Sequence, residues 1–425
     1  MNPGLFCGAL LLFHLASPAL AQEETAQDLA LGRSLSGLLD YARQHNPDYR
    51  VMHSEAAAAE ARAAAAGTLA DPKMRMEWRD ITRFGEQSPT LNPSRVGSTR
   101  YLLMQDVPWF GKRDLQQQVA TAEATGADSQ VVVTWAELAA RVCGIQAQRY
   151  FSQQGQQLLQ QTVALMKQLE QNVRDRYAGG LASQQDVVRA QLEQTALQSE
   201  QLMLTTERHH LDHRLNELLG RPANATLAAP EPPPSPPEAD QLQLTALEQR
   251  LHQHNPQLAL LSSRIVGAEK NRDLTYLNRY PDVTVGVSPI QYRDRIREWE
   301  VMAEINIPLQ QQARRDRERE AEQMLNAAQQ RQQATANQLL SQLATTLTDI
   351  ETARRNEQLI STTLLPQTEI SHKSALVGYE TGRVDFTTLL ESQRQWRQVQ
   401  QNRIKAQTEL HKALADLEQL LGEPL

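Results

Sequence analysis

The chain has 425 residues, of which 40% are hydrophobic and 5% aromatic, and its mean hydropathy is −0.53. Because this composition is poor in core material, we expect long, thin helices that each bury one narrow stripe. The net charge of −7 excludes the strongly basic face of a nucleic-acid-binding protein. Beyond the N-terminal region, no run reaches the about 18 apolar residues that a transmembrane helix requires.

Residues 1–21 are predicted to be a secretory signal peptide. A short apolar run precedes the small-residue cleavage motif Ala19–Ala21, so the exported chain would begin near Gln22. Cys7 lies inside this signal, and no small residue precedes it. A lipid anchor is therefore not predicted, although the pattern leaves a lipidated form open. Cys143 is then the sole mature cysteine, which excludes an intrachain disulfide and favours a buried apolar role.

The next segments are predicted helices over 34–46 and 48–70. Ser34 is a candidate N-cap, and prolines at 47 and 72 end the two helices because the residue before proline avoids the α region. The period then changes to two, which predicts strands at about 73–83 and 98–107. Apolar side chains alternate with polar ones, beginning with Met74, Met76 and Trp78. Tilted strands of this length could cross an outer-membrane-type bilayer.

A very long helix is predicted from 112 to 178, because this segment contains no proline and no turn cluster. It would span roughly 100 Å at 1.5 Å per residue, which suits a coiled coil. One stripe recurs at multiples of seven and is formed by Leu138, Ile145, Leu159, Met166 and Val173. A second stripe is formed by Val142, Val163 and Tyr177. A turn at 179–182 and a capping box at Ser183 and Asp186 begin a return helix over 183–219.

A proline-rich linker at 230–239 separates this first repeat, 22–229, from a second repeat, 240–425. The second repeat is predicted to contain two helices, two strands, a long helix and a return helix in the same order. The strands are at about 282–288 and 298–307, the long helix at 312–379 with a kink at Pro366, and the return helix at 385–421.

Three pairs of short motifs indicate the duplication. Tyr177 and Tyr379 begin Tyr-x-x-Gly turns that are 202 residues apart (379 − 177), and the Leu-Leu-Gly motifs at 218–220 and 420–422 have the same offset. The motif His-Asn-Pro also occurs twice, ending at Pro47 and at Pro256. The predicted fold is therefore mainly α with a small β part, in two structural repeats of helix, β-hairpin, long helix, tip and return helix. Four strands cannot close a barrel alone, so membrane insertion would require several chains.

This order of elements, with the two Tyr-x-x-Gly tips, resembles the TolC family of outer-membrane efflux channels over about residues 34–422. The string Pro108-Trp109-Phe110-Gly111-Lys112-Arg113 most resembles the heavy-metal efflux branch, the CzcC/CusC-like proteins. The resemblance implies a homotrimer with a twelve-stranded outer-membrane β-barrel and a periplasmic α-helical barrel. It also implies a periplasmic adaptor (membrane fusion protein) and an inner-membrane RND-type pump as partners, with lipid around the barrel.

The tips are the candidate functional site. By resemblance, Gly180, Leu181, Gly382 and Arg383 would dock the adaptor, and Asp186, Arg189 and Glu391 would line a gate in a narrowing tunnel. Acidic side chains there would concentrate cations. Thr388 stands 202 residues after Asp186, so a double acidic ring is in doubt. Asp186 as a cap and Glu391 as a surface residue are equally good interpretations.

Other chemistry is not predicted. His209 and His213 have i, i+4 ligand spacing, but with no third strong ligand nearby except Glu217, a solvated helix face is favoured. No catalytic triad, phosphate-binding loop or CxxC motif is present, so we predict neither an enzyme nor a cofactor. Two alternatives remain, a periplasmic adaptor and a structural coiled-coil protein without a pore. The sequence does not indicate whether the exported compound is a metal or a drug.

Overall fold

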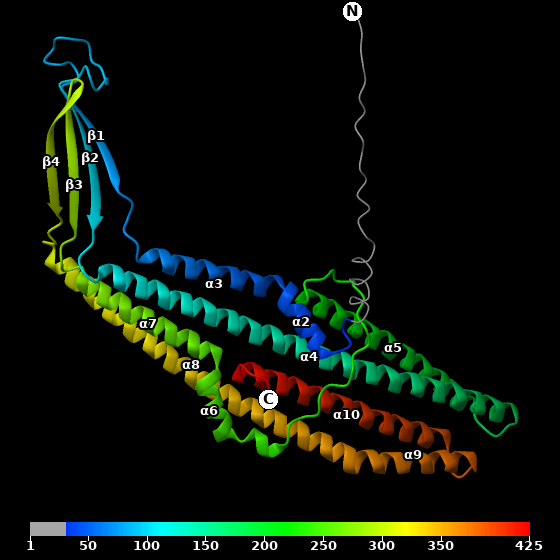
Figure 1. Cartoon of the computed structure of the whole chain (residues 1–425). Coiled ribbons are helices and arrows are strands. Elements are labelled where there is room, and N and C mark those ends of the chain that lie inside the picture. The colour runs from blue at the N-terminus through cyan, green and yellow to red at the C-terminus, as the bar shows by residue number, and fades with distance from the viewer. Residues whose placement is uncertain (1–30) are drawn as a thin grey trace, which may run out of the picture. The chain divides into compact units, whose positions relative to one another are not determined.

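The computed structural model describes residues 31–425, so the predicted signal peptide and Cys7 lie outside the described residues. This part of the chain is mainly helical with one small sheet, as the sequence predicts (Figure 1). None of its helices combines the length and the apolar character needed to span a membrane.

The element order runs through two similar series. The first series is α2 (Leu35–His45), α3 (Pro47–Ala66), β1 (Lys73–Arg79), β2 (Ser98–Val107), α4 (Lys112–Ala178) and α5 (Gln184–Leu218). After a short 3₁₀ turn, the second is α6 (Leu244–His254), α7 (Pro256–Leu277), β3 (Val283–Tyr292), β4 (Arg295–Ile305), α8 (Gln311–Leu359), a π-helical turn (Ile360–Leu364), α9 (Leu365–Glu380) and α10 (Phe386–Leu421).

The chain forms two compact units, and each unit takes segments from both sequence halves. Unit 1 contains Met1–Asn46, Arg141–Pro236 and Ile350–Ala415, and therefore both helical tips. Unit 2 contains Pro47–Ala140, Pro237–Asp349 and Asp416–Leu425, and therefore the sheet. The boundaries of the units are thus not those of the proposed repeats.

The sheet of unit 2 is antiparallel with the strand order β1-β2-β3-β4 (Figure 1). Its register aligns one row of apolar side chains across all four strands: Met74, Leu103, Val287 and Val301. Each of these four side chains is exposed. Because alternate residues share a face, this row defines an apolar face of the sheet that the described chain leaves uncovered.

The opposite face of the sheet carries cross-strand ion pairs beside a few buried apolar side chains, namely Leu102, Met104 and Ile290. Arg100 on β2 lies 3.7 Å from Glu77 on β1, contacts Glu300 on β4, and donates to the Ser288 hydroxyl at 3.3 Å. Lys73 and Asp106 pair in the same way at 2.6 Å. The uncovered face is thus apolar, whereas the opposite face combines ion pairs with buried apolar side chains.

The strand ends differ from the prediction at both hairpins. β1 ends at Arg79 rather than 83, because Asp80 has a left-handed backbone with φ 51° and its carbonyl accepts from Gly97 at 2.9 Å. β3 extends to Tyr292, four residues beyond the predicted end at 288. Proline lacks the N–H that a central strand would use, but Pro289 is accommodated because the pairing with β2 is interrupted there and resumes at Ile290.

Serine and asparagine side chains form hydrogen bonds with backbone groups at the helix ends. Ser34 caps α2 by accepting from the Gly37 amide at 3.2 Å, as predicted. The asparagine of each His-Asn-Pro motif has a second role. Asn46 donates to the Leu218 carbonyl in unit 1, and Asn255 donates to the Leu420 carbonyl in unit 2, both at 2.8 Å. Each asparagine thus ties a helix junction to the end of a return helix.

The predicted helix over 312–379 is not one uniform helix. A π-helical turn at Ile360–Leu364 precedes Pro366, so α8 and α9 are separate α-helical segments. Proline has no N–H and its ring collides with the carbonyl four residues earlier. The wider π turn is a common local adjustment to such a disruption.

The predicted stripe of α4 is largely confirmed within unit 1. Leu159, Met166 and Val173 are fully or almost fully buried. Tyr177 is an exception, because 47% of its surface is exposed, and its assignment to the second stripe is wrong. Cys143 is a free cysteine of intermediate burial rather than a fully buried one.

Candidate functional site

The two tips of unit 1 are turns with nearly the same backbone. Gly180 and Gly382 have φ values of 72° and 73°, which L side chains rarely adopt. The amide of the next residue returns to the preceding helix in each case: Leu181 donates to the Arg176 carbonyl at 2.7 Å, and Arg383 to the Gly378 carbonyl at 2.8 Å. Both tips therefore close α4 and α9 by the same glycine-dependent geometry.

The return helices begin with different caps. In the first tip, Ser183 and Asp186 form the predicted capping box, with the Asp186 amide donating to the Ser183 hydroxyl at 3.2 Å. In the second, the Thr388 amide donates to the Asp385 carboxylate at 2.8 Å. Hydrogen bonds from Thr388, led by its side chain, lower the pKa of Asp385 below its ordinary value. The second cap is thus an ionised carboxylate over most of the pH range.

Contacts between the tips come mainly from two arginines of the first tip. Arg176 donates to the Tyr379 carbonyl at 2.8 Å, and its guanidinium lies 4.7 Å from the centre of the Tyr379 ring. Arg189 on α5 donates to the Thr387 hydroxyl on α10. These contacts link residues about 200 positions apart in the sequence, so they hold the two helical hairpins together at their ends.

A ladder of ionic contacts continues the connection between α5 and α10. Glu193 is only 2% exposed and receives Arg394 at 2.8 Å, with Arg397 at 3.6 Å. Arg397 also contacts Glu200, one heptad further along α5. Because a buried carboxylate without a cation is costly, this ladder favours one register between the two helices.

The predicted site residues all lie near the tips. Asp186 is occupied by its cap, Arg189 bridges to α10, and Glu391 is exposed and receives a weak contact from Gln395 at 3.5 Å. Within residues 31–425, a hydrogen bond joins Arg189 to the opposite tip, whereas none joins Asp186 or Glu391 to it. The four proposed docking residues are all exposed, namely Gly180, Leu181, Gly382 and Arg383.

Sequence reasoning missed the residues that join the tips, chiefly Arg176, Tyr379 and Glu193. One signal was available, because Glu193 and Glu200 are seven residues apart on the predicted return helix and therefore lie on the same helix face. Their partners Arg394 and Arg397 could not be inferred, because the pairing of α5 with α10 depends on tertiary packing.

The histidines of α5 lie on an exposed helix face. No group of three or more His, Cys, Asp or Glu side chains in this part of the chain is arranged to hold a metal ion. His209 and His213 are both exposed on α5.

The fold, with its two helical tips and its four-stranded sheet, is similar to solved structures of outer-membrane channels. The chain has a TM-score of 0.78 and 19% identity to the outer-membrane channel OprN, covering 91% of this chain and 89% of that one. VceC from Vibrio cholerae gives 0.78 and 16%, covering 92% and 96%. CusC gives 0.69 and 16%, covering 92% of each chain.

Residues 247–423 match the family model described as outer membrane efflux protein. This segment falls within the predicted second repeat, and the match agrees with the resemblance to the TolC family that the sequence shows. No curated protein matches the chain.

Proposed function

We propose that this protein is an outer-membrane channel that passively conducts substrate from the periplasm to the outside. The single observation that carries the proposal is the sheet, whose apolar face is exposed on all four strands while the other face carries cross-strand ion pairs. Its outer strands β1 and β4 each pair on one side only. Unpaired strand edges are not tolerated in lipid, so further copies of the chain must complete the sheet.

Three copies would supply twelve strands, an even number of the kind found in outer-membrane barrels. The protein would then be a homotrimer with its barrel in the outer membrane and its helices in the periplasm, and each chain would consist of two structural repeats. This arrangement is also what the family resemblance implies.

The exposed tips would meet the periplasmic adaptor of an inner-membrane RND-type pump. Leu181 is 73% exposed at the end of the first tip, where it would supply apolar contact area for the adaptor. With Gly180, Gly382 and Arg383 it would form the docking surface. Contacts such as Arg189 to Thr387 would hold the tips in a closed arrangement until the adaptor binds.

Asp186, Arg189 and Glu391 would line the gate, where carboxylates raise the local concentration of cations. Metal cations are the substrates we favour, because the 108–113 string resembles the heavy-metal branch. Drugs are the alternative. Deletion of the gene and growth on a panel of metal salts and drugs would separate the two: loss of tolerance confined to metals supports the first, and loss confined to drugs rules it out.

Reconstitution tests the channel itself. Purified protein in planar lipid bilayers should give discrete conductance steps, and the double substitution Asp186→Asn with Glu391→Gln should lower cation selectivity. Absence of conductance from a protein that fractionates with the outer membrane would contradict the proposal. A water-soluble monomer would instead favour the adaptor or coiled-coil alternatives.

A further inference from the structure

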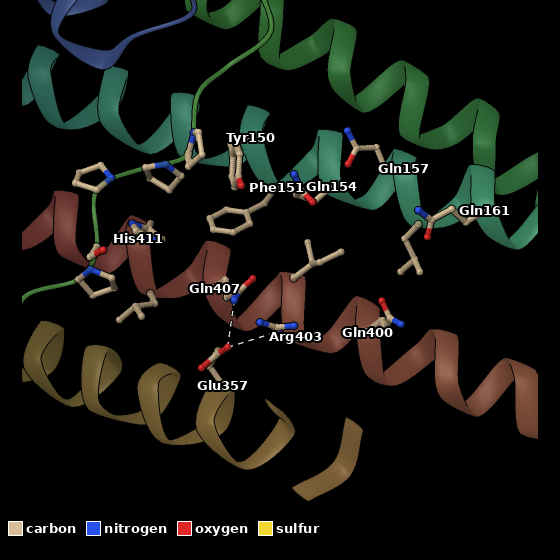
Figure 2. A pocket seen from close by; sticks show the side chains of 18 residues that line it. Tyr150, Phe151, Gln154, Gln157, Gln161, Glu357, Gln400, Arg403, Gln407 and His411 are labelled. Carbon is tan, nitrogen blue, oxygen red and sulfur yellow. Dashed lines mark hydrogen bonds and ion pairs between the residues drawn. The ribbon is translucent and has the colours of Figure 1, made fainter. Parts of the chain in front are cut away.

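A cavity of about 570 Å³ lies within unit 1, beneath the proline-rich linker (Figure 2). Its walls are α4, α10, the end of α8 and residues 232–236 of the linker. The volume falls within the range of about 300–1,000 Å³ that is typical of small-molecule sites. None of the tip residues discussed above lines it.

The cavity exists because two polar stripes face each other where a coiled coil would place apolar residues. On α4 the stripe is Tyr150, Gln154, Gln157 and Gln161, and on α10 it is Gln400, Arg403, Gln407 and His411. Each stripe has the spacing of three and four residues that keeps side chains on one helix face. Since glutamines do not interlock as apolar knobs do, these faces leave a space between them.

Several of these polar groups are free to bind a ligand. Within residues 31–425, the side chains of Tyr150, Gln154, Gln157, Gln161 and Gln400 make no hydrogen bond to protein, although others nearby do. Four amides and one hydroxyl therefore offer both donors and acceptors to the same space.

The charges in the lining cancel. Figure 2 shows Glu357 facing Arg403 and Gln407, with separations of 3.4 and 3.1 Å. Burial lowers the pKa of His411 below its ordinary value, which favours its neutral form. An ionic ligand would thus find no unmatched charge in this cavity.

Flat apolar surfaces complete the site. Tyr150 and Phe151 lie edge to face with centroids 5.2 Å apart, and Phe151 lies 5.5 Å from the His411 ring. Proline rings at 232, 233, 234 and 236 cover another side. Just before them the chain is fixed, because the Glu231 amide donates to the Arg33 carbonyl at 3.0 Å and Arg149 donates to the Ala228 carbonyl at 3.1 Å. The lining is thus held in place before any ligand arrives.

We propose that this cavity binds a neutral saccharide, whose hydroxyls would pair with the glutamine amides while its C–H faces pack on the aromatic and proline rings. A ligand that is neutral and rich in hydroxyls satisfies each feature of the lining. An extended peptide fits less well, because helix backbones are internally bonded and proline has no N–H, so no free backbone edge exists for strand pairing.

Calorimetry on the detergent-solubilised full chain tests the proposal with two soluble probes, maltotriose and tri-N-acetylchitotriose. We expect one of them to bind with one site per chain. The double substitution Gln154→Ala with Gln400→Ala should weaken that binding by about tenfold or more, since two hydrogen bonds are lost. Gln160→Ala is the matched control, because Gln160 is an exposed glutamine on the same helix that does not line the cavity.

Failure of both trisaccharides to bind would overturn the proposal, as would equal weakening by the control or competition by a neutral glutamine tripeptide. The source of the saccharide is tested by cosedimentation with purified cell-wall glycan. Cosedimentation that the double variant loses identifies a polymeric glycan, whereas soluble binding without cosedimentation identifies a free saccharide. Circular dichroism confirms that each variant is folded.

Discussion

The two tips share a motif and a backbone but differ in what their tyrosines do. Tyr379 is 6% exposed and packs on Phe386 with ring centroids 5.7 Å apart, whereas Tyr177 is 47% exposed. The position 202 residues before Phe386 is Gln184, a polar residue that offers no ring for Tyr177 to pack against. The motif therefore specifies the turn, and a residue outside the motif decides whether the tyrosine joins the core.

A second exchange strengthens the same difference. Gly378 leaves room for Val384, since a Cβ at Gly378 would lie 2.6 Å from that side chain. The equivalent position in the first tip is Arg176, which instead reaches over the Tyr379 ring. The side chains of the second tip thus pack against one another, and Arg176 of the first tip contacts them.

The largest expected effect comes from removing the ring that buries Tyr379. Phe386→Ala should lower the free energy of unfolding by about 3 kcal/mol, because a fully buried aromatic side chain leaves a cavity. The matched change in the first tip, Gln184→Ala, should cost less than about 0.5 kcal/mol. Chemical denaturation followed by circular dichroism measures both, and equal losses would contradict the proposed difference between the tips.

Removing the Arg176 side chain should have a smaller effect on the free energy of unfolding. Arg176→Ala loses the hydrogen bond to the Tyr379 carbonyl and the contact with its ring, for about 1 kcal/mol. If the tips form the gate, the same variant should also raise conductance in planar bilayers. Arg174→Ala, which removes only an exposed pair with Glu170, is the control and should leave conductance unchanged.

An aromatic side chain at position 184 should make the environment of Tyr177 more like that of Tyr379. Gln184→Phe is expected to cover Tyr177 in part, with a stability change within about 1 kcal/mol. Iodination of Tyr177, quantified by mass spectrometry, should become slower than in the wild type. An unchanged rate would show that the residue at position 184 does not control the exposure of this tyrosine.

The smallest expected effect is the loss of the Asp385 helix cap at low pH. The folded pKa of Asp385 is lowered by Thr388, so its stabilising contribution is present above its unfolded pKa and is lost as pH falls through the lower, folded value. The protection of the Thr388 amide against hydrogen exchange, relative to its intrinsic rate at each pH, should therefore fall as the pH drops below about 4. Asp385→Asn keeps a capping oxygen and should remove this pH dependence; a variant that retained it would assign the effect to another group.

Local signals predicted much of the fold because they act within a few residues. The helix predicted over 112–178 spans Lys112–Ala178 because no proline interrupts it, and β2 ends at Val107 before a proline. Features that depend on tertiary contacts were not predictable in this way. Examples are Arg176 over Tyr379, the interrupted pairing that admits Pro289, and the ladder from Glu193 to Arg397.

The proposed channel depends most on the sheet, whose outer strands β1 and β4 would pair with strands from other copies of the chain. Native mass spectrometry of the detergent-solubilised protein, extracted from the outer membrane, measures the number of copies directly. We expect the mass of a trimer, and after heating we expect the mass of a single chain. A protein that is a single chain under all extraction conditions would contradict the account.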